Sequence, residues 1–149
     1  MILAGAGAGV RVGATSRVGR DASPCLLFTP SEVEGYNTDM AATVIALQGE
    51  LGSGKTTFAQ AFGKVVGVED HMQSPTFVIM KSYDVDWKGY KKLIHIDAYR
   101  LESESELLHL GWDEMIKDAG NLILIEWPER VEGIIPKDSK RIHFKHDRP

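Results

Sequence analysis

Residues 49–56 have the residue types and the spacing of a phosphate-binding loop. Gly49, Gly54, Lys55 and Thr56 satisfy the pattern G-x-x-x-x-G-K-[ST]. Glycines let the main chain wrap around phosphate oxygens, so that successive N–H groups and the positive end of a following helix compensate the phosphate charge. We expect Lys55 to reach the β- and γ-phosphates and the Thr56 hydroxyl to bind Mg²⁺. The pattern therefore predicts a site for ATP or ADP with Mg²⁺. The residues assigned to the nucleotide are Gly49, Glu50, Leu51, Gly52, Ser53, Gly54, Lys55, Thr56 and Thr57.

The segments on either side of this loop have the patterns of a strand and a helix. Residues 43–48 form a short apolar, β-branched run that stops at a glycine, which is typical of a buried strand. Apolar residues then recur at helical spacing from Phe58 to Val66, and Gly67 stands where a C-cap glycine belongs. A chance match to the loop pattern would lack this strand–loop–helix context.

Asp97 and Glu126 are the acidic residues best placed to work with a bound metal. Each ends an apolar run that reads as a strand, and the carboxyl ends of neighbouring strands in an α/β sheet meet at one edge. We expect one of the two to organise Mg²⁺ and the other to orient water. The alternatives are that Asp97 is a turn or cap residue and that Glu126 is an exposed loop charge.

Thr76 lies in the polar segment Ser74–Phe77, which could move with the nucleotide state. Its hydroxyl would then reach the γ-phosphate or the metal. The alternative is an ordinary turn stiffened by Pro75. No Asn-Lys-x-Asp element, which reads guanine in switch GTPases, follows in the chain, so ATP is favoured over GTP.

The remaining patterns predict short elements on both faces of a sheet. Ser103 and Glu106 match a capping box ahead of a short helix. The other predicted elements are strands at 77–83 and 91–96 that pair as an antiparallel hairpin, a short helix at 112–119, a central strand at 121–126 and an edge strand at 141–145. The fold class is α/β, a P-loop NTPase-like three-layer α/β/α sandwich with a mixed, mostly parallel central sheet.

Size and composition limit the possible functions. The chain of 149 residues has a formal net charge of −4, which suits one domain and disfavours holding nucleic acid by electrostatics alone. The lone cysteine and the lack of a long apolar run favour a soluble, cytoplasmic protein with no membrane association. We divide the chain into an atypical or flexible segment, residues 1–29, and a single P-loop ATPase domain, residues 30–149. The Arg-bearing, acid-free start also has the composition of an organellar transit peptide.

The order of the motifs resembles the TsaE family, also called YjeE, the ATPase component of the bacterial machinery that makes threonylcarbamoyladenosine in tRNA. The resemblance covers about residues 44–144. The matching segments are residues 49–58 (GELGSGKTTF), 74–77 (SPTF), 95–101 (HIDAYRL) and 125–129 (IEWPE). The sequence departs from the family at residues 30–40, which offer only a short, glycine-interrupted version of the helix that usually precedes the first strand.

The resemblance implies an ATPase that is weak alone and acts with TsaD and TsaB, so that tRNA is reached only through the complex. TsaD would transfer the threonylcarbamoyl group to adenosine 37. The resemblance also implies catalytic roles for Asp97, Glu126, Thr76 and Trp127, although Trp127 could equally be an aromatic residue that covers the core. The rival functions are a small-molecule or nucleotide kinase and a non-catalytic ATP-binding scaffold.

Overall fold

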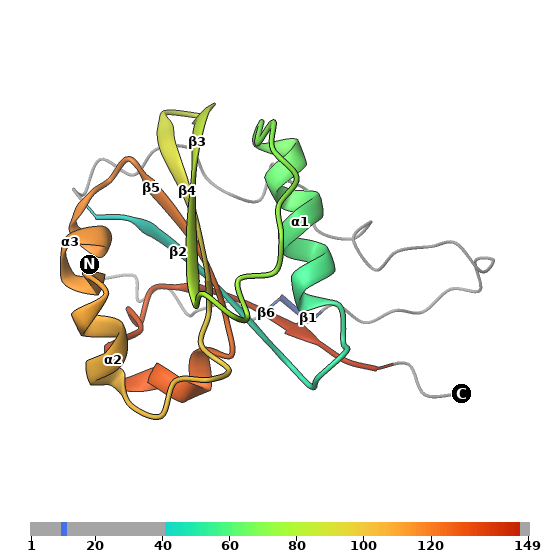
Figure 1. The fold of residues 1–149 in the computed structure, drawn as a ribbon, viewed down its shortest axis with the longest axis vertical. Coiled ribbons are helices and arrows are strands. Elements are labelled where there is room, and N and C mark those ends of the chain that lie inside the picture. Colours follow the sequence, from blue (N-terminus) through green and yellow to red (C-terminus); the bar gives the residue numbers. More distant parts are fainter. Residues whose placement is uncertain (1–9, 12–40, 147–149) are drawn as a thin grey trace, which may run out of the picture.

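The computed structural model describes residues 10–11 and 41–146, and its centre is a six-stranded sheet in the order β1-β6-β2-β5-β4-β3 (Figure 1). The strands are β1 (Val10–Arg11), β2 (Thr43–Gly49), β3 (Met80–Trp87), β4 (Tyr90–Asp97), β5 (Asn121–Glu126) and β6 (Lys140–Phe144). The helices are α1 (Lys55–Val65), α2 (Glu104–His109), α3 (Trp112–Lys117) and the 3-10 segment η3 (Pro128–Ile134). The predicted division at residue 29 and the departure at residues 30–40 lie outside the described residues.

The sheet is mixed and mostly parallel, as predicted. β2 lies between β5 and β6 and runs parallel to both, and β4 runs parallel to β5. Only β3 pairs antiparallel among the described strands, through the predicted hairpin with β4. This arrangement brings the carboxyl ends of β2, β4 and β5 to one edge of the sheet.

Helices cover both faces of the sheet, which confirms the three-layer architecture (Figure 1). Alternation along β2 sends Ile45 and Leu47 into the core beneath α1, and Val44 and Ala46 into the core beneath α2 and α3. β5 is buried at every position, as expected for a central strand of a parallel sheet. The site described below therefore rests on a rigid, fully covered strand.

Two predicted boundaries and one predicted strand position need correction. β3 begins at Met80 rather than at residue 77, because Ile79 has a φ of 67° and the N–H groups of Val78 and Ile79 both bind the Pro75 carbonyl as a turn. α3 ends at Lys117 rather than 119, because the next residue is extended. β6 is not an edge strand within the described sheet, since β1 pairs with its other side. In the described ranges, no helix is both long enough and apolar enough to cross a bilayer.

Candidate functional site

A cavity of about 260 Å³ opens at the carboxyl edge of the sheet. Its walls come from the loop after β2, the first turn of α1, the segment before β3, and the residues that end or follow β4 and β5. The lining residues are Leu51, Gly52, Gly54, Lys55, Thr56, Thr57, Thr76, Asp97, Tyr99, Glu126 and Trp127. Most of the predicted site residues therefore meet in one place. Gly49, Glu50 and Ser53 do not line the cavity, but each contacts the Lys55 ammonium.

The loop turns sharply into α1 at Gly54. This residue is the N-cap and has φ 98° and ψ 12°, a left-handed conformation that glycine adopts without steric cost. Helical hydrogen bonding starts at once, with the Phe58 N–H donating to the Gly54 carbonyl at 2.9 Å. The first turn of α1 therefore lines the cavity with the positive end of the helix.

Lys55 is only 4% exposed and its ammonium is held inside the loop. Nζ donates to the carbonyl oxygens of Gly49 at 2.7 Å and Glu50 at 2.8 Å. It also lies 4.2 Å from the centre of the Trp127 ring, within the range of a cation–π contact. The loop and the aromatic ring thus place a positive charge at the floor of the cavity.

Burial lowers the pKa of Lys55 below its ordinary value of 10.5. The negative charges of Glu126, Glu129 and Asp97 oppose this shift, because they favour the protonated ammonium. Those carboxylates give Lys55 its nearby compensating charge. An anionic ligand in the cavity would favour the charged lysine further.

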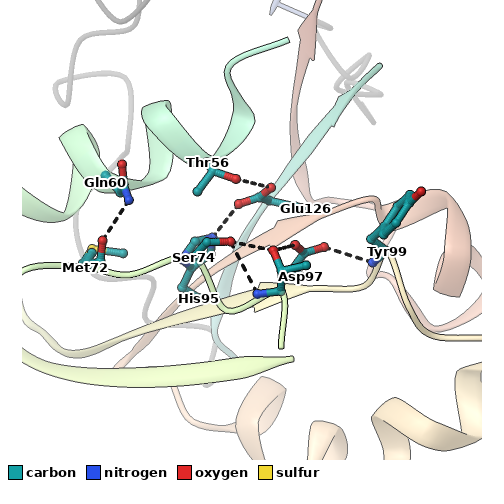
Figure 2. Close-up of polar contacts among 9 residues, drawn as sticks. Thr56, Gln60, Met72, Ser74, His95, Asp97, Tyr99 and Glu126 are labelled. Carbon is teal, nitrogen blue, oxygen red and sulfur yellow. Dashed lines mark hydrogen bonds and ion pairs between the residues drawn. The ribbon is translucent and has the colours of Figure 1, made fainter. Parts of the chain in front are cut away.

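Glu126 is clamped between α1 and β4 (Figure 2). It is 2% exposed, and its Oε2 accepts a hydrogen bond from the Thr56 hydroxyl at 2.9 Å. On the other side, its Oε1 lies 2.7 Å from Nε2 of His95. The alternative interpretation of Glu126 as an exposed loop charge is therefore wrong.

Asp97 lies beside Glu126 on the neighbouring strand and is also buried. Its Oδ2 accepts from the Thr76 hydroxyl at 2.9 Å, and its Oδ1 accepts from the Tyr99 N–H at 3.0 Å (Figure 2). The bond to Tyr99 closes a turn, as expected from the alternative that Asp97 is a turn or cap residue. The bond to Thr76 joins the acid to the segment that the sequence singled out, so Asp97 serves the turn and faces the cavity at once.

Thr76 sits in a turn built on Pro75, yet its hydroxyl points to the site. It contacts the Ser74 hydroxyl at 2.6 Å as well as Asp97. The chain just before it is tied to α1, because the side-chain amide of Gln60 donates to the Met72 carbonyl at 2.9 Å (Figure 2). The segment therefore connects helix α1 with the carboxylate at the end of β4.

Trp127 combines a core contact with a site contact. It has φ 58° and ψ 50°, unusual for a bulky residue, and its N–H donates to the Leu47 carbonyl at 3.3 Å. Part of the Trp127 ring packs on the core beneath α2 and α3. The Lys55 ammonium lies over the ring. The centre of the Tyr99 ring lies 5.0 Å from the centre of the Trp127 ring. Strain of this kind gathers at functional sites.

No role was predicted for His95 from the sequence. Its 2.7 Å contact with Glu126 makes it part of the site's polar network. The signal was available, because alternation along a strand puts His95 on the same face as Asp97, two residues later. Tyr99, on the cavity wall, also went unassigned.

Comparisons with known proteins identify relatives of this chain. The family model described as "Threonylcarbamoyl adenosine biosynthesis protein TsaE" matches residues 29–149. The tRNA threonylcarbamoyladenosine biosynthesis protein TsaE of Bacillus subtilis is 40% identical over 102 residues, which cover 68% of this chain and 61% of that protein. The protein of the same name from Rickettsia bellii is 32% identical over 129 residues, or 83% of this chain and 86% of that protein.

The fold also has a match among solved structures. A crystal structure of Bacillus subtilis YdiB superposes with a TM-score of 0.51 at 30% identity, covering 72% of this chain and 63% of that one. The matched regions span 61%, 66% and 56% of the relatives from Bacillus subtilis, Borreliella burgdorferi and Nostoc, which is less than two thirds of each.

Proposed function

Because this chain belongs to the TsaE family of threonylcarbamoyl adenosine biosynthesis proteins, we propose that it binds ATP with Mg²⁺ and hydrolyses it to support tRNA threonylcarbamoyladenosine synthesis. The observation that carries the proposal is the meeting of the loop, Thr56, Glu126 and Asp97 around one cavity. The proposal places the protein in the cytoplasm, where ATP and tRNA are available.

The loop supplies the grip on the phosphates. Backbone N–H groups at the start of α1 and the helix dipole favour an anion at this point. Lys55 adds a full positive charge at the cavity floor and exchanges its carbonyl partners for phosphate oxygens. We keep residues 49–57, the set predicted from sequence, as the proposed nucleotide-binding residues.

Thr56 and Glu126 are the pair that fits a magnesium ion. A hydroxyl and a carboxylate 2.9 Å apart are hard oxygen ligands, the kind that Mg²⁺ prefers. An ion held by this pair would supply charge neutralisation to the phosphate groups of the nucleotide. We therefore assign Mg²⁺ binding to Glu126 and orientation of the attacking water to Asp97.

Asp97 and Thr76 then form the hydrolytic arm. Water attacks the γ-phosphorus in line with the departing ADP oxygen, so a new P–O bond forms as the bond to ADP breaks. Asp97 orients that water and holds the Thr76 hydroxyl in place. Lys55 stabilises the charge that moves onto the leaving phosphate oxygens, and Trp127 keeps the ammonium directed into the cavity.

We also propose that this protein hydrolyses ATP only weakly by itself and that full turnover requires TsaD and TsaB. Three exposed residues lie at or next to the cavity, and we call them its rim: Leu51, which lines the cavity and is 72% exposed, and Phe77 and Val78, which follow the lining residue Thr76 and are 83% and 55% exposed. Bulk water at an open site screens the charges that stabilise the transition state, so a protein that covers the rim would raise turnover. tRNA takes part through that complex, since this chain's net charge of −4 gives it little electrostatic hold on RNA.

Calorimetry of ADP and ATP binding to a Lys55→Ala variant tests the grip on phosphate. We expect binding to be abolished, whereas Lys64→Ala, on the last turn of the same helix, serves as a matched control and keeps it. Unchanged affinity in Lys55→Ala would defeat the assignment. Phosphate release with TsaD and TsaB added then tests turnover.

The same release measurement separates the rival functions. Stimulated release of inorganic phosphate supports the ATPase. Transfer of the γ-phosphoryl group to a small acceptor would instead indicate a kinase, and tight binding with no loss of ATP would indicate a scaffold.

A further inference from the structure

We propose that His95 is a positioning residue that holds Glu126 in the orientation its metal-binding role requires. This inference rests on the proposed function above and deepens it. The carrying observation is a buried imidazole whose Nε2 lies 2.7 Å from the Glu126 carboxylate, on the oxygen that Thr56 does not contact.

The position of His95 in the fold is one where an aliphatic residue would be expected. It is 0% exposed, in the interior strand β4, and faces the same side of the sheet as the fully buried Leu93. Burying an imidazole costs free energy unless it is hydrogen-bonded. Glu126 supplies that bond.

The other ring nitrogen of His95, Nδ1, makes no hydrogen bond among the described residues, which is informative about the role of this side chain. This nitrogen is also buried. Buried polar atoms without partners are rare and call for an explanation. If packing alone decided the residue at position 95, a leucine would fill the space without an unpartnered nitrogen. The bond from Nε2 to Glu126 is the feature that leucine could not provide.

The two bonds on Glu126 together fix its side chain. Oε1 is held from β4 by His95 and Oε2 from α1 by Thr56, so the carboxylate cannot rotate without breaking one of them. A metal ligand is commonly oriented by a neighbouring group of this kind, and loss of the neighbour weakens metal affinity. His95 reaches the metal site only through Glu126 and is not itself a catalytic residue.

The test compares His95→Leu with His95→Gln by calorimetry of ADP binding, with and without Mg²⁺. Leucine fills the space but cannot donate, whereas the side-chain amide of glutamine can place a donor near the position of Nε2. We expect metal-free ADP affinity to stay near the wild-type value in both variants, because the loop and Lys55 grip the phosphates. In His95→Leu the Mg²⁺ dependence of binding should shift to concentrations about 10–100-fold higher, the usual cost of losing an orienting partner. His95→Gln should recover most of that loss.

The outcomes separate this inference from the proposed function. If the wild type binds Mg²⁺ with ADP and all variants show the same Mg²⁺ dependence, the positioning role is wrong although the nucleotide site stands. If the wild type binds no nucleotide, the proposed function fails and the role of His95 fails with it. Should His95→Leu not fold, His95→Asn replaces it, because its shorter side chain cannot reach Glu126. Equal Mg²⁺ dependence of the Asn and Gln variants would then overturn the inference.

Discussion

Replacing Gly49 with alanine is expected to destabilise the nucleotide-free protein by about 2–5 kcal/mol, because two separate costs add at this position. Gly49 has a φ of +159°, which L side chains rarely adopt. A Cβ built there would also lie 2.6 Å from the backbone oxygen of Phe144 and 2.9 Å from its Cβ. The carbonyl oxygen belongs to β6, which pairs with β2 at this residue, so it cannot rotate away.

The magnitude follows from treating the two costs separately. A side chain in an unfavourable left-handed conformation costs about 1–2 kcal/mol, and overpacking against atoms that cannot move costs about 1–3 kcal/mol. Gly67→Ala is the matched control. It has a φ of +94° but no atom within 4 Å of the added Cβ, so it should pay only the conformational cost. The two variants should therefore differ by about 1–3 kcal/mol.

Urea unfolding followed by circular dichroism measures both variants without nucleotide. Natural domains have about 5–15 kcal/mol of stability, so Gly49→Ala should retain enough structure for a complete transition curve. Equal losses in Gly49→Ala and Gly67→Ala would refute the reasoning, because they would show that the approach of β6 to the loop adds no cost.

Four further outcomes are expected. Gly63→Ala should lower the free energy of unfolding in urea by about 1–2 kcal/mol, because its Cβ would lie 1.9 Å from Sδ of the buried Met72 and this overlap outweighs the gain in helix propensity. If the losses of Gly63→Ala and Met72→Ala simply add in the double variant, the clash is contradicted. Trp127→Phe should keep the unfolding free energy within about 1 kcal/mol while phosphate release with partners falls roughly 10-fold, since the face over Lys55 shrinks; lost stability with normal turnover would favour a core role. Glu106→Ala should cost about 1 kcal/mol in thermal or urea unfolding, because its carboxylate accepts from the N–H at the start of α2, and Glu106→Gln should retain most of that stability. Burial lowers the pKa of Lys55 in the folded protein below its ordinary value of 10.5. Between the folded-state pKa and 10.5 the unfolded chain binds more protons, so the free energy of unfolding should rise with pH in that range. The rise should be smaller in Lys55→Met, and an identical pH profile of stability in that variant would contradict the prediction.

The loop at residues 49–56 and its flanking elements could be predicted from sequence because each depends on local patterns. The β2 run, the glycine pattern and the helical spacing after it gave the strand, loop and helix with nearly correct bounds. The capping box at Ser103 gave the start of α2. The meeting of Asp97 with Glu126 followed from the rule that parallel strands end at one edge, and the register pairs these two residues.

What the sequence did not reveal depends on contacts between distant segments. The turn before β3 depends on Ile79 taking a positive φ, which no propensity rule predicts for a β-branched residue. Its carbonyl accepts the Asp97 N–H at 2.8 Å, a bond that the sequence alone cannot locate. The place of β6 beside β1 depends on residues far apart in the chain. Strand alternation puts His95 on the same face as Asp97, but its partner Glu126 lies on another strand, and without that contact a histidine in an apolar strand resembles a core residue.

The complete burial of β5 and the exposure of the rim predict that local unfolding occurs at the rim and not in the central strand. Amide groups in a fully covered central strand exchange with solvent only when most of the domain unfolds, whereas exposed turns open at far lower free energy. Glu126 ends the protected strand, and Leu51, Phe77 and Val78 belong to the easily opened surface. We therefore expect that a ligand entering the cavity would displace the rim more readily than the carboxylate beneath it.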